Sequence, residues 1–199
     1  MSRRLSSFLA AGVAALLIVP AASALRVHVR VEGKTRTIYG STEPTLTVRS
    51  NAIDALESAS VAGEFYYHVT TTAFGPYVDQ VGRYLAAASN GWVFKVNGVS
   101  PPIGADRVAL KDGDRVLWYW ATFGPRGGPP TLVLRVGAKR GCYRVLSQDD
   151  NGKTTPARRA RLHVGSRSVL ARSGSACVGA HRGLVTATLK GAVRSNALR

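Results

Sequence analysis

The stretch formed by residues 91–120 constrains the fold of this chain more than any other. It contains all three tryptophans and two turn signals, Asn97-Gly98 and Lys111-Asp112-Gly113-Asp114. An Asn-Gly pair readily takes the positive φ angles of a tight hairpin turn. The run that follows, residues 115–120, places Trp118 on one face of a strand and Tyr119 on the other. Since both faces carry large apolar side chains, we expect a central strand that is covered on both sides.

The residues that precede this stretch predict an early strand pair followed by a helix. Residues 25–32 alternate apolar and polar side chains, the pattern of a strand with one buried and one solvent-facing side, and His28 lies on the polar side. Asn51 and Asp54 have the spacing of a capping box, so a short helix should start there and bury Ile53 and Leu56. Further strands are predicted at residues 35–39, 45–48, 65–72 and 92–96, whereas residues 77–85 fit a helix or a strand equally. This order of elements is that of a β-grasp (α+β) domain.

The same residues carry a resemblance to a known family. Gly91-Trp92, the turn at Asn97-Gly98, Gly104-Ala105-Asp106, and residues 110–114 followed by Trp118-Tyr119-Trp120 resemble the transcobalamin-like C-terminal domain, an uncharacterised bacterial β-grasp family. The resemblance covers about residues 25–123. It implies a secreted or envelope module related to domains that bind soluble ligands, the best known of which hold part of a cobalamin. We predict no cofactor, and a cobalamin-type ligand is an implication of this resemblance alone.

Several side chains of this domain are candidates for ligand recognition. Aromatic rings can stack on planar or sugar ligands, but an aromatic strand is more often part of a core. We expect Trp118 and Trp120 to be core, whereas Trp92 fits either role. The candidate ligand-binding residues are Trp92, Phe94, Asn97, Pro101 and Pro102.

A run rich in glycine and proline divides the chain. Residues 124–130, Gly-Pro-Arg-Gly-Gly-Pro-Pro, suit neither a helix nor the interior of a sheet and are predicted to be a linker. The charge also changes here. Residues 25–124 hold ten Lys and Arg against nine Asp and Glu, whereas residues 125–199 hold fifteen against two. We therefore expect a first domain at 25–123 and a strongly basic second domain at 131–199.

The second domain is predicted to be a small immunoglobulin-like β-sandwich, so the chain as a whole should be mainly β. Short strands joined by glycine-containing turns are expected at residues 131–136, 142–146, 160–164, 168–170 and 185–189. The turn spacing around 165–169, 173–178, 183–188 and 192–196 resembles carboxypeptidase-regulatory or bacterial immunoglobulin-like domains, which serve as spacers or adhesion units. Its Cys142 and Cys177 are the only cysteines of the chain and are predicted to form a disulfide, with two unpaired buried thiols as the alternative.

The first 24 residues have the layout of an export signal. Arg3 and Arg4 precede an apolar run at residues 8–19, and small residues follow it up to Ala24. Cleavage is expected after Ala24, which leaves no membrane span; retention of the run as an anchor is the alternative. The predicted location is secreted or in the cell envelope.

The residues give no support for a reaction. The four histidines form no pair at metal-ligand spacing, so no metal site is predicted and the chain is predicted not to be an enzyme. The basic run at 153–161, with Arg158 and Arg159, could attract an anionic polymer by charge, or could be a solvated arginine-rich surface. With Tyr143 as the only aromatic of this half, nucleic acid is not a predicted partner.

Two functional hypotheses follow. In the first, the chain is an exported, non-enzymatic binding module whose β-grasp domain recognises a small ligand or a protein, with the second domain as a spacer. In the second, it is a structural or adhesive envelope protein whose basic second domain binds anionic polymer.

Overall fold

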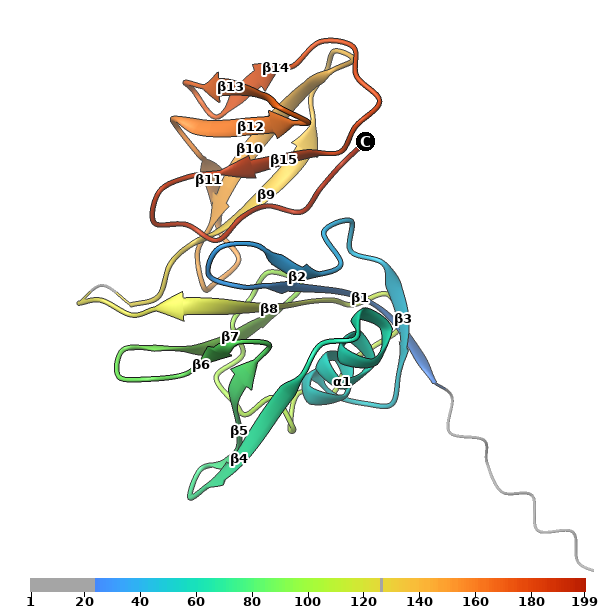
Figure 1. Cartoon of the computed structure of the whole chain (residues 1–199), viewed down its shortest axis with the longest axis vertical. Helices are drawn as coiled ribbons and strands as arrows, with labels where there is room; N and C mark the ends of the chain where they lie inside the picture. The colour runs from blue at the N-terminus through green and yellow to red at the C-terminus, as the bar shows by residue number, and fades with distance from the viewer. Residues whose placement is uncertain (1–23, 126) are drawn as a thin grey trace, which may run out of the picture.

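The computed structural model describes residues 24–125 and 127–199, and the chain forms two layered β units stacked end on end (Figure 1). The predicted export signal lies outside the described residues, except for Ala24 at its end. The described part of the chain holds no helix long and apolar enough to cross a membrane.

A five-stranded mixed sheet forms the centre of the first unit. Its strands are β1 (Leu25–Glu32), β2 (Thr37–Tyr39), β3 (Thr45–Val48), β7 (Asn90–Val96) and β8 (Arg115–Thr122). The order is β2-β1-β8-β7, with β3 pairing the first half of β1, and β1 and β8 run parallel. The prediction that β8 is central is therefore confirmed. The parallel pair with a helical crossover is compatible with a β-grasp, which stays a prediction.

One helix, α1 (Ala52–Gly63), packs on one face of this sheet. Asn51 accepts a hydrogen bond from the amide of Asp54, and the Asp54 carboxylate accepts one from the amide of Asn51, which confirms the predicted capping box. Leu56 is buried as predicted, whereas Ile53 is half-buried and Ala52, Ala55 and Ala59 complete the buried side. Small alanines allow the helix axis to approach the sheet closely.

The segment that fits either a helix or a strand forms strands. A small sheet contains β4 (Tyr67–Thr72), β5 (Gly75–Val81) and β6 (Tyr84–Leu85), in that order. Asn97 and Gly98 have φ values of 52° and 84°, as a tight turn requires. That turn, however, connects Val96 only to Val99, because β7 pairs along its length with β8 after a long loop.

Two sheets packed face to face form the second unit. The first contains β9 (Thr131–Val136), β10 (Cys142–Gln148), β11 (Thr154–Pro156) and β14 (Ser175–Cys177). The second contains β12 (Ala160–Val164), β13 (Arg167–Ala171) and β15 (Val185–Thr188). Their inner faces bury Leu132, Leu134, Val145, Leu162 and Val185 in a core separate from that of the first unit. The mainly β prediction is confirmed, whereas the immunoglobulin-like assignment stays a prediction.

Cys142 and Cys177 form a disulfide between directly opposed positions of β10 and β14. Of the two predicted states of these residues, the bonded one is confirmed. The bond closes a loop with a sequence separation of 35 residues, which includes all three strands β11, β12 and β13.

Removal of this disulfide should destabilise the second unit. On the chain-entropy model, closing a loop of this length lowers the entropy of the unfolded chain enough to stabilise the fold by about 3 to 4 kcal/mol. We expect the double variant Cys142→Ser, Cys177→Ser to lose about that much free energy of unfolding in urea titrations. Adding a reductant should destabilise the native chain to the same level and leave the double variant unchanged. Equal free energies of unfolding for the native chain and the double variant, both measured without reductant, would contradict this.

Candidate functional site

The two units meet on the face of the five-stranded sheet that is opposite to α1. Val29, Val31, Val116 and Trp118 point into the core beneath α1, so the alternate residues of β1, β7 and β8 point the other way. On that side Tyr119 and Ala121 are buried against Val193 of the second unit. The apolar residues on both faces of β8 therefore have two different partners, one within its own unit and one in the next.

Trp92, a predicted ligand-binding residue, lies in the core of the first unit. Its side chain is 2% exposed, its ring packs edge-on against Trp120 at 5.7 Å, and its Nε1 donates to the carbonyl oxygen of Tyr84 at 2.9 Å. Both the faces and the polar atom of this indole are therefore already occupied. Of the two roles that the sequence allowed for Trp92, the geometry fits the core role.

Phe94 is half-buried and stacks on Trp118, with ring centroids 5.0 Å apart. Pro101 is half-buried and Pro102 is exposed, both in the loop after the Asn97-Gly98 turn. Four cavities of the described part of the chain are well defined, and none of them is lined by Trp92, Phe94 or these prolines. The sequence-predicted ligand site is thus divided between the core and a surface loop.

The Asn97-Gly98 turn itself is docked on the second unit. Val99 forms an antiparallel bridge with Asn151, and Ser100 donates its amide to the carbonyl oxygen of Asp150 at 2.8 Å and its hydroxyl to the carboxylate at 3.1 Å. The Asn97 side chain is exposed and lines the cleft between the units, where it donates to Asp114 and accepts from the amide of Arg115. The hairpin proposed to recognise a ligand therefore binds the β10–β11 turn of the same chain.

Lys95 is the most deeply buried cation of this contact. Its side chain leaves β7 and crosses into the second unit, where Nζ donates to the carbonyl oxygen of Asp149 at 2.8 Å and to the hydroxyl of Thr131 at 3.3 Å. Asp150 lies 3.3 Å away, and Lys95 is 1% exposed. Burial lowers the pKa of Lys95, and the attraction of Asp150 opposes that shift.

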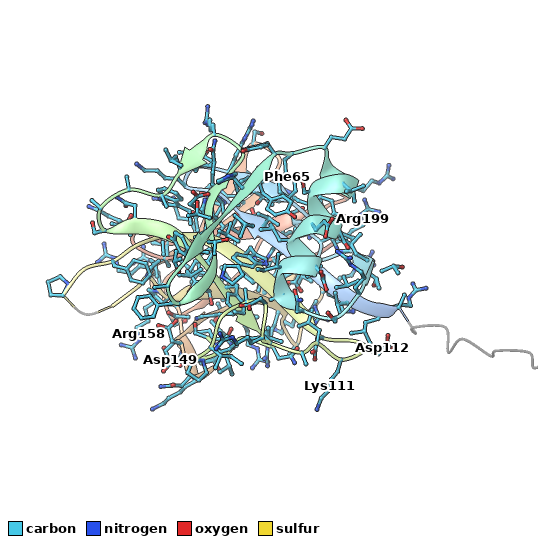
Figure 2. The ribbon with its side chains drawn as sticks, turned by 90° about the horizontal axis from the view of Figure 1, so that it is seen from below. Phe65, Lys111, Asp112, Asp149, Arg158 and Arg199 are labelled. Carbon is cyan, nitrogen blue, oxygen red and sulfur yellow. A yellow bond between two sulfur atoms is a disulfide. The ribbon has the colours of Figure 1, made fainter. Side chains whose placement is uncertain are left out.

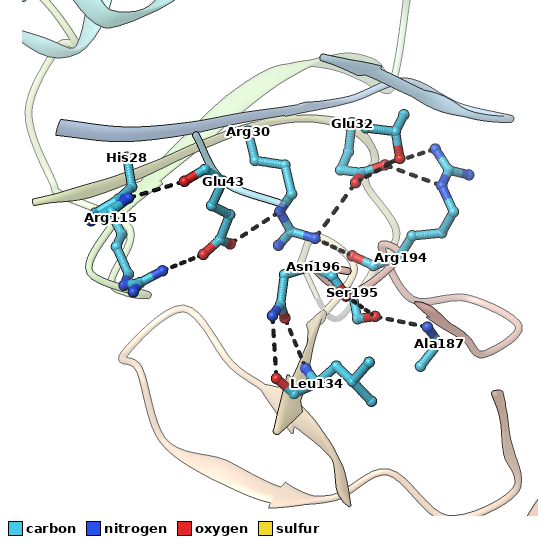
Figure 3. Close-up of polar contacts among 11 residues, drawn as sticks. His28, Arg30, Glu32, Glu43, Arg115, Leu134, Ala187, Arg194, Ser195 and Asn196 are labelled. Atoms are coloured by element: carbon cyan, nitrogen blue, oxygen red, sulfur yellow. Dashed lines mark hydrogen bonds and ion pairs between the residues drawn. The ribbon is translucent and has the colours of Figure 1, made fainter. Parts of the chain in front are cut away.

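A second buried ionic group joins the C-terminal segment to β1 (Figure 3). Glu32, which is fully buried, accepts a hydrogen bond from Nε of Arg194 at 3.1 Å, and its carboxylate lies 2.9 Å from NH2 of Arg194 and 3.5 Å from NH1 of Arg30. Arg30 is 3% exposed; its NH1 donates to the carbonyl oxygen of Arg194, and its Nε lies 3.4 Å from Glu43. Burial raises the pKa of Glu32, while the neighbouring guanidinium groups of Arg30 and Arg194 oppose the shift.

This network corrects one sequence-based expectation. The alternation in residues 25–32 predicted that the polar side of the strand would face solvent, yet Arg30 and Glu32 are both buried on that side. The physical reason is that the C-terminal segment covers this side of β1. Its Arg194, which binds Glu32 and Arg30, is too far along the chain to be identified from a local pattern. His28, on the same side, is half-buried and its Nδ1 lies 3.0 Å from the carbonyl oxygen of Glu43.

The C-terminal segment completes the junction. Thr131 forms a parallel bridge with Val193, and the amide of Ala197 donates to the carbonyl oxygen of Ser41 at 2.6 Å. The Asn196 side chain accepts from the amide of Leu134 and donates to its carbonyl oxygen (Figure 3). These contacts tie the last residues of the chain to both units at once. The second unit is therefore held against the first by three elements: the hairpin, Lys95 and the C-terminal segment.

The outer surface of the second unit is almost free of acidic groups. Its two carboxylates both belong to the β10–β11 turn: Asp150 binds Ser100 and Lys95, and Asp149 accepts from the amides of Asn151 and Lys153. Its exposed cations are Arg135, Lys139, Arg140, Arg144, Lys153, Arg158, Arg159, Arg161, Arg167, Arg172, Arg182, Lys190 and Arg199. None of these thirteen forms an ion pair with a described carboxylate.

Four of these cations lie together at one end of β12 and β13, and we call them the arginine patch: Arg158, Arg159, Arg161 and Arg172. Arg159 and Arg172 are next to each other, because the Arg159 amide points at the carbonyl oxygens of Ala171 and Arg172, at 2.9 and 3.3 Å. Arg158 lies at the edge of the molecule and points away from it (Figure 2). The basic run noticed in the sequence thus presents its charges outward.

The residues that sequence reasoning missed are Lys95, Arg30, Glu32 and Arg194. One signal was present: Lys95 leaves β7 on the same side as Val93 and lies opposite Leu117 of β8, and both of these neighbours are apolar. A lone lysine there indicates a covered face with polar partners, since buried cations are almost always paired. Among residues 24–125 and 127–199, no group of three or more His, Cys, Asp or Glu is placed to hold a metal ion.

Comparison with known proteins adds one finding. Residues 50–122 match a domain of unknown function (DUF4430). The matched segment runs from the N-cap region of α1 to the end of β8 and so excludes β1, β2 and β3. No curated protein matches the chain. The family match is narrower than the predicted resemblance at 25–123, and neither a transcobalamin-like nor a carboxypeptidase-regulatory family is shown.

Replacing Glu32 should weaken the junction between the units. In Glu32→Gln, the buried Arg30 and the half-buried Arg194 would lose the charge between them, and breaking a buried ion pair in this way costs about 3 to 5 kcal/mol. We expect a loss of free energy of unfolding of about that size in urea titrations. The matched control is Glu57→Gln, which removes a half-exposed pair with Arg49 and should cost less than about 1 kcal/mol. Equal costs for the two variants would contradict a structural role for the network.

Tyr119 should make stability depend on alkaline pH. Burial at the junction raises the pKa of Tyr119 to about 12 from 10.0, so its contribution is fully present below pH 10 and is lost as the pH rises from 10 towards 12. Two pKa units correspond to roughly 2.7 kcal/mol at most. We expect Tyr119→Phe to reduce the fall in free energy of unfolding between pH 9.5 and 11.5. The exposed Tyr66→Phe should keep the native slope, and identical slopes in all three proteins would refute the assignment.

Proposed function

We propose that this protein is an exported, non-enzymatic component of the cell envelope or the secreted fraction, and that its second unit holds an anionic polymer. The observation that carries the proposal is the distribution of charge on that unit. Thirteen exposed cations surround it, while its only two carboxylates lie at the turn that docks on the first unit. A positively charged surface attracts a negatively charged polymer over several ångströms and so raises the local concentration of that polymer.

The chemistry of the cations supports a polymer rather than a single small anion. Arginine is always charged and offers a planar fork of donors that matches carboxylate, sulfate and phosphate groups. A polyanion presents such groups at intervals along its length, so many weak contacts add up to firm attachment even when each is weak. The arginine patch gathers four of these cations at one end of β12 and β13 and is where we expect the polymer to make its main contacts.

The disulfide supports the proposed location. Bonds such as Cys142–Cys177 persist mainly in oxidising compartments outside the cytoplasm. The layout of residues 1–24 points the same way. Together they favour export, where anionic envelope polymers would be within reach.

The alternative, a ligand held by the first unit, has less support. Its likeness to the transcobalamin-like family suggests a small-molecule role, and a β-grasp fold for this unit fits the observed strand order. However, Val99 and Ser100, which follow the Asn97-Gly98 turn, are bound to Asn151 and Asp150 of the second unit, and Trp92 is buried. We therefore propose that the first unit serves mainly as a rigid support for the second.

The test is binding of the mature chain to dextran sulfate, with uncharged dextran as the blank. We compare the native chain with the triple variant Arg158→Gln, Arg159→Gln, Arg172→Gln by fluorescence titration at several salt concentrations. If each cation contributes about 1 kcal/mol near an anionic surface, the triple variant should bind roughly 100-fold more weakly. Native binding should also fall steeply between about 50 and 300 mM salt, because screening shortens the reach of exposed charges.

A matched variant separates local recognition from net charge. Lys34→Gln, Arg36→Gln, Lys111→Gln removes three exposed and unpaired cations from the first unit, so the total charge changes equally. We expect it to bind dextran sulfate as the native chain does. Binding that ignores salt, or equal losses in the two triple variants, would overturn the proposal that the second unit holds the polymer.

A further inference from the structure

A cleft of about 640 Å³ lies between the two units and is distinct from the arginine patch. Its charged lining consists of Arg30, Arg115, Lys95, Arg135, Arg144 and one carboxylate, Glu43. Five cations thus face a single acid across the junction. Leu117, Val133 and Leu198 add an apolar part to the same lining.

Most of these cations already have partners. Arg30 and Arg115 both pair with Glu43, and Arg30 also contacts Glu32. Lys95 is bound to the carbonyl oxygen of Asp149 and lies near the carboxylate of Asp150. The remaining two, Arg135 and Arg144, form no ion pair with any carboxylate of residues 24–125 or 127–199.

The two unpaired arginines lie side by side. Arg135 of β9 and Arg144 of β10 are directly opposed in the antiparallel register, so their side chains leave the same face of the sheet. Like charges at opposed positions repel one another and destabilise a strand pair. In this sheet the repulsion is not relieved by any neighbouring strand: the register partner of Arg144 on β14 is Ser175, which carries no charge.

We propose that the cleft is a binding site for a phosphate monoester, with Arg135 and Arg144 holding the phosphate and the apolar lining receiving the group attached to it. A phosphate monoester carries a charge between about −1.5 and −2 near pH 7, which neutralises both arginines. Two guanidinium forks can donate to its oxygens in a bidentate manner. Leu117 and Val133 lie beside them in the same cleft and offer apolar contact to a ring or an acyl chain.

This site is separate from the arginine patch, where the polymer is proposed to make its main contacts. Arg135 and Arg144 belong to the sheet that faces the first unit, whereas the arginine patch is at β12 and β13 of the other sheet. A small ligand could therefore bind in the cleft whether or not the arginine patch binds a polymer. Either proposal can fail without the other.

The experiment uses phenyl phosphate as the probe, with calorimetric titration and the arginine side-chain NMR signals of the mature chain as the measurements. We expect Arg135→Gln and Arg144→Gln each to raise the dissociation constant at least tenfold, and the double variant to abolish binding. Arg144→Lys, which keeps the charge without the fork, should bind between the native and the Gln variant. Glycerol phosphate should bind more weakly than phenyl phosphate because it lacks an apolar group.

The controls decide what a loss of binding means. Arg167→Gln removes an exposed, unpaired cation from β13, outside the cleft, and should leave phenyl phosphate binding unchanged. The double cleft variant should remain folded and should still bind dextran sulfate, whereas the arginine-patch variant should still bind phenyl phosphate. Equal binding by the native chain and the double variant, or signal changes confined to residues outside the cleft, would overturn the site.

A further arm distinguishes the source of the phosphate. Vesicles of phosphatidylcholine with phosphatidic acid, compared with vesicles of phosphatidylcholine alone, present the same monoester on a lipid. Binding that needs phosphatidic acid and is lost in the double variant identifies a lipid source. Binding of phenyl phosphate without such vesicle binding identifies a soluble phosphorylated molecule.

Discussion

The structure depends on the second face of the five-stranded sheet being covered. β8 carries Trp118 towards α1 and Tyr119 in the opposite direction, so burying one face alone would leave large apolar groups in water. At about 25 cal/mol per Å² of apolar surface, exposing even one such aromatic side chain is unfavourable by several kcal/mol. The second unit supplies the cover, and its position follows from that requirement rather than from the glycine- and proline-rich connection between the units.

The same face carries charges, and these determine how the cover fits. Arg30, Glu32 and Lys95 would each be costly to bury alone, because a charge removed from water must recover its lost solvation from partners. Each has at least one partner in the second unit or the C-terminal segment: the carbonyl oxygen of Arg194 for Arg30, the guanidinium of Arg194 for Glu32, and the carbonyl oxygen of Asp149 for Lys95. A shifted docking would leave at least one of these groups unpaired, so the polar contacts select one arrangement while the apolar contacts supply most of the stabilisation.

How far the sequence predicts this arrangement depends on how far apart along the chain the interacting residues lie. The capping box at Asn51 and Asp54, the strands at 25–32 and 131–136 and the central place of β8 follow from patterns within a few residues. The burial of Arg30 and Glu32 does not, because their partner Arg194 is more than 160 positions away and carries no local mark. The role of Asn97 and Gly98 shows the same limit: the turn was predicted from its dipeptide, but its contact with Asn151 depends on the packing of two units.

The junction also explains why the cationic surface of the second unit is so uniform. Both of its acids are used by the turn that receives Lys95 and Ser100, so nothing is left to neutralise the outer arginines. Because the sheet of β9 and β10 faces the first unit, a large partner can approach the second unit freely only from the sheet of β12, β13 and β15 and from its edges. The arginine patch lies on that free side. Arg135 and Arg144 lie on the other side, where their exposed side chains line the cleft of about 640 Å³ between the units. The docking of the second unit on the first thus divides the positive charge of the second unit between two places. One is an open surface that a large anion can reach, and the other is a cleft that suits a small one.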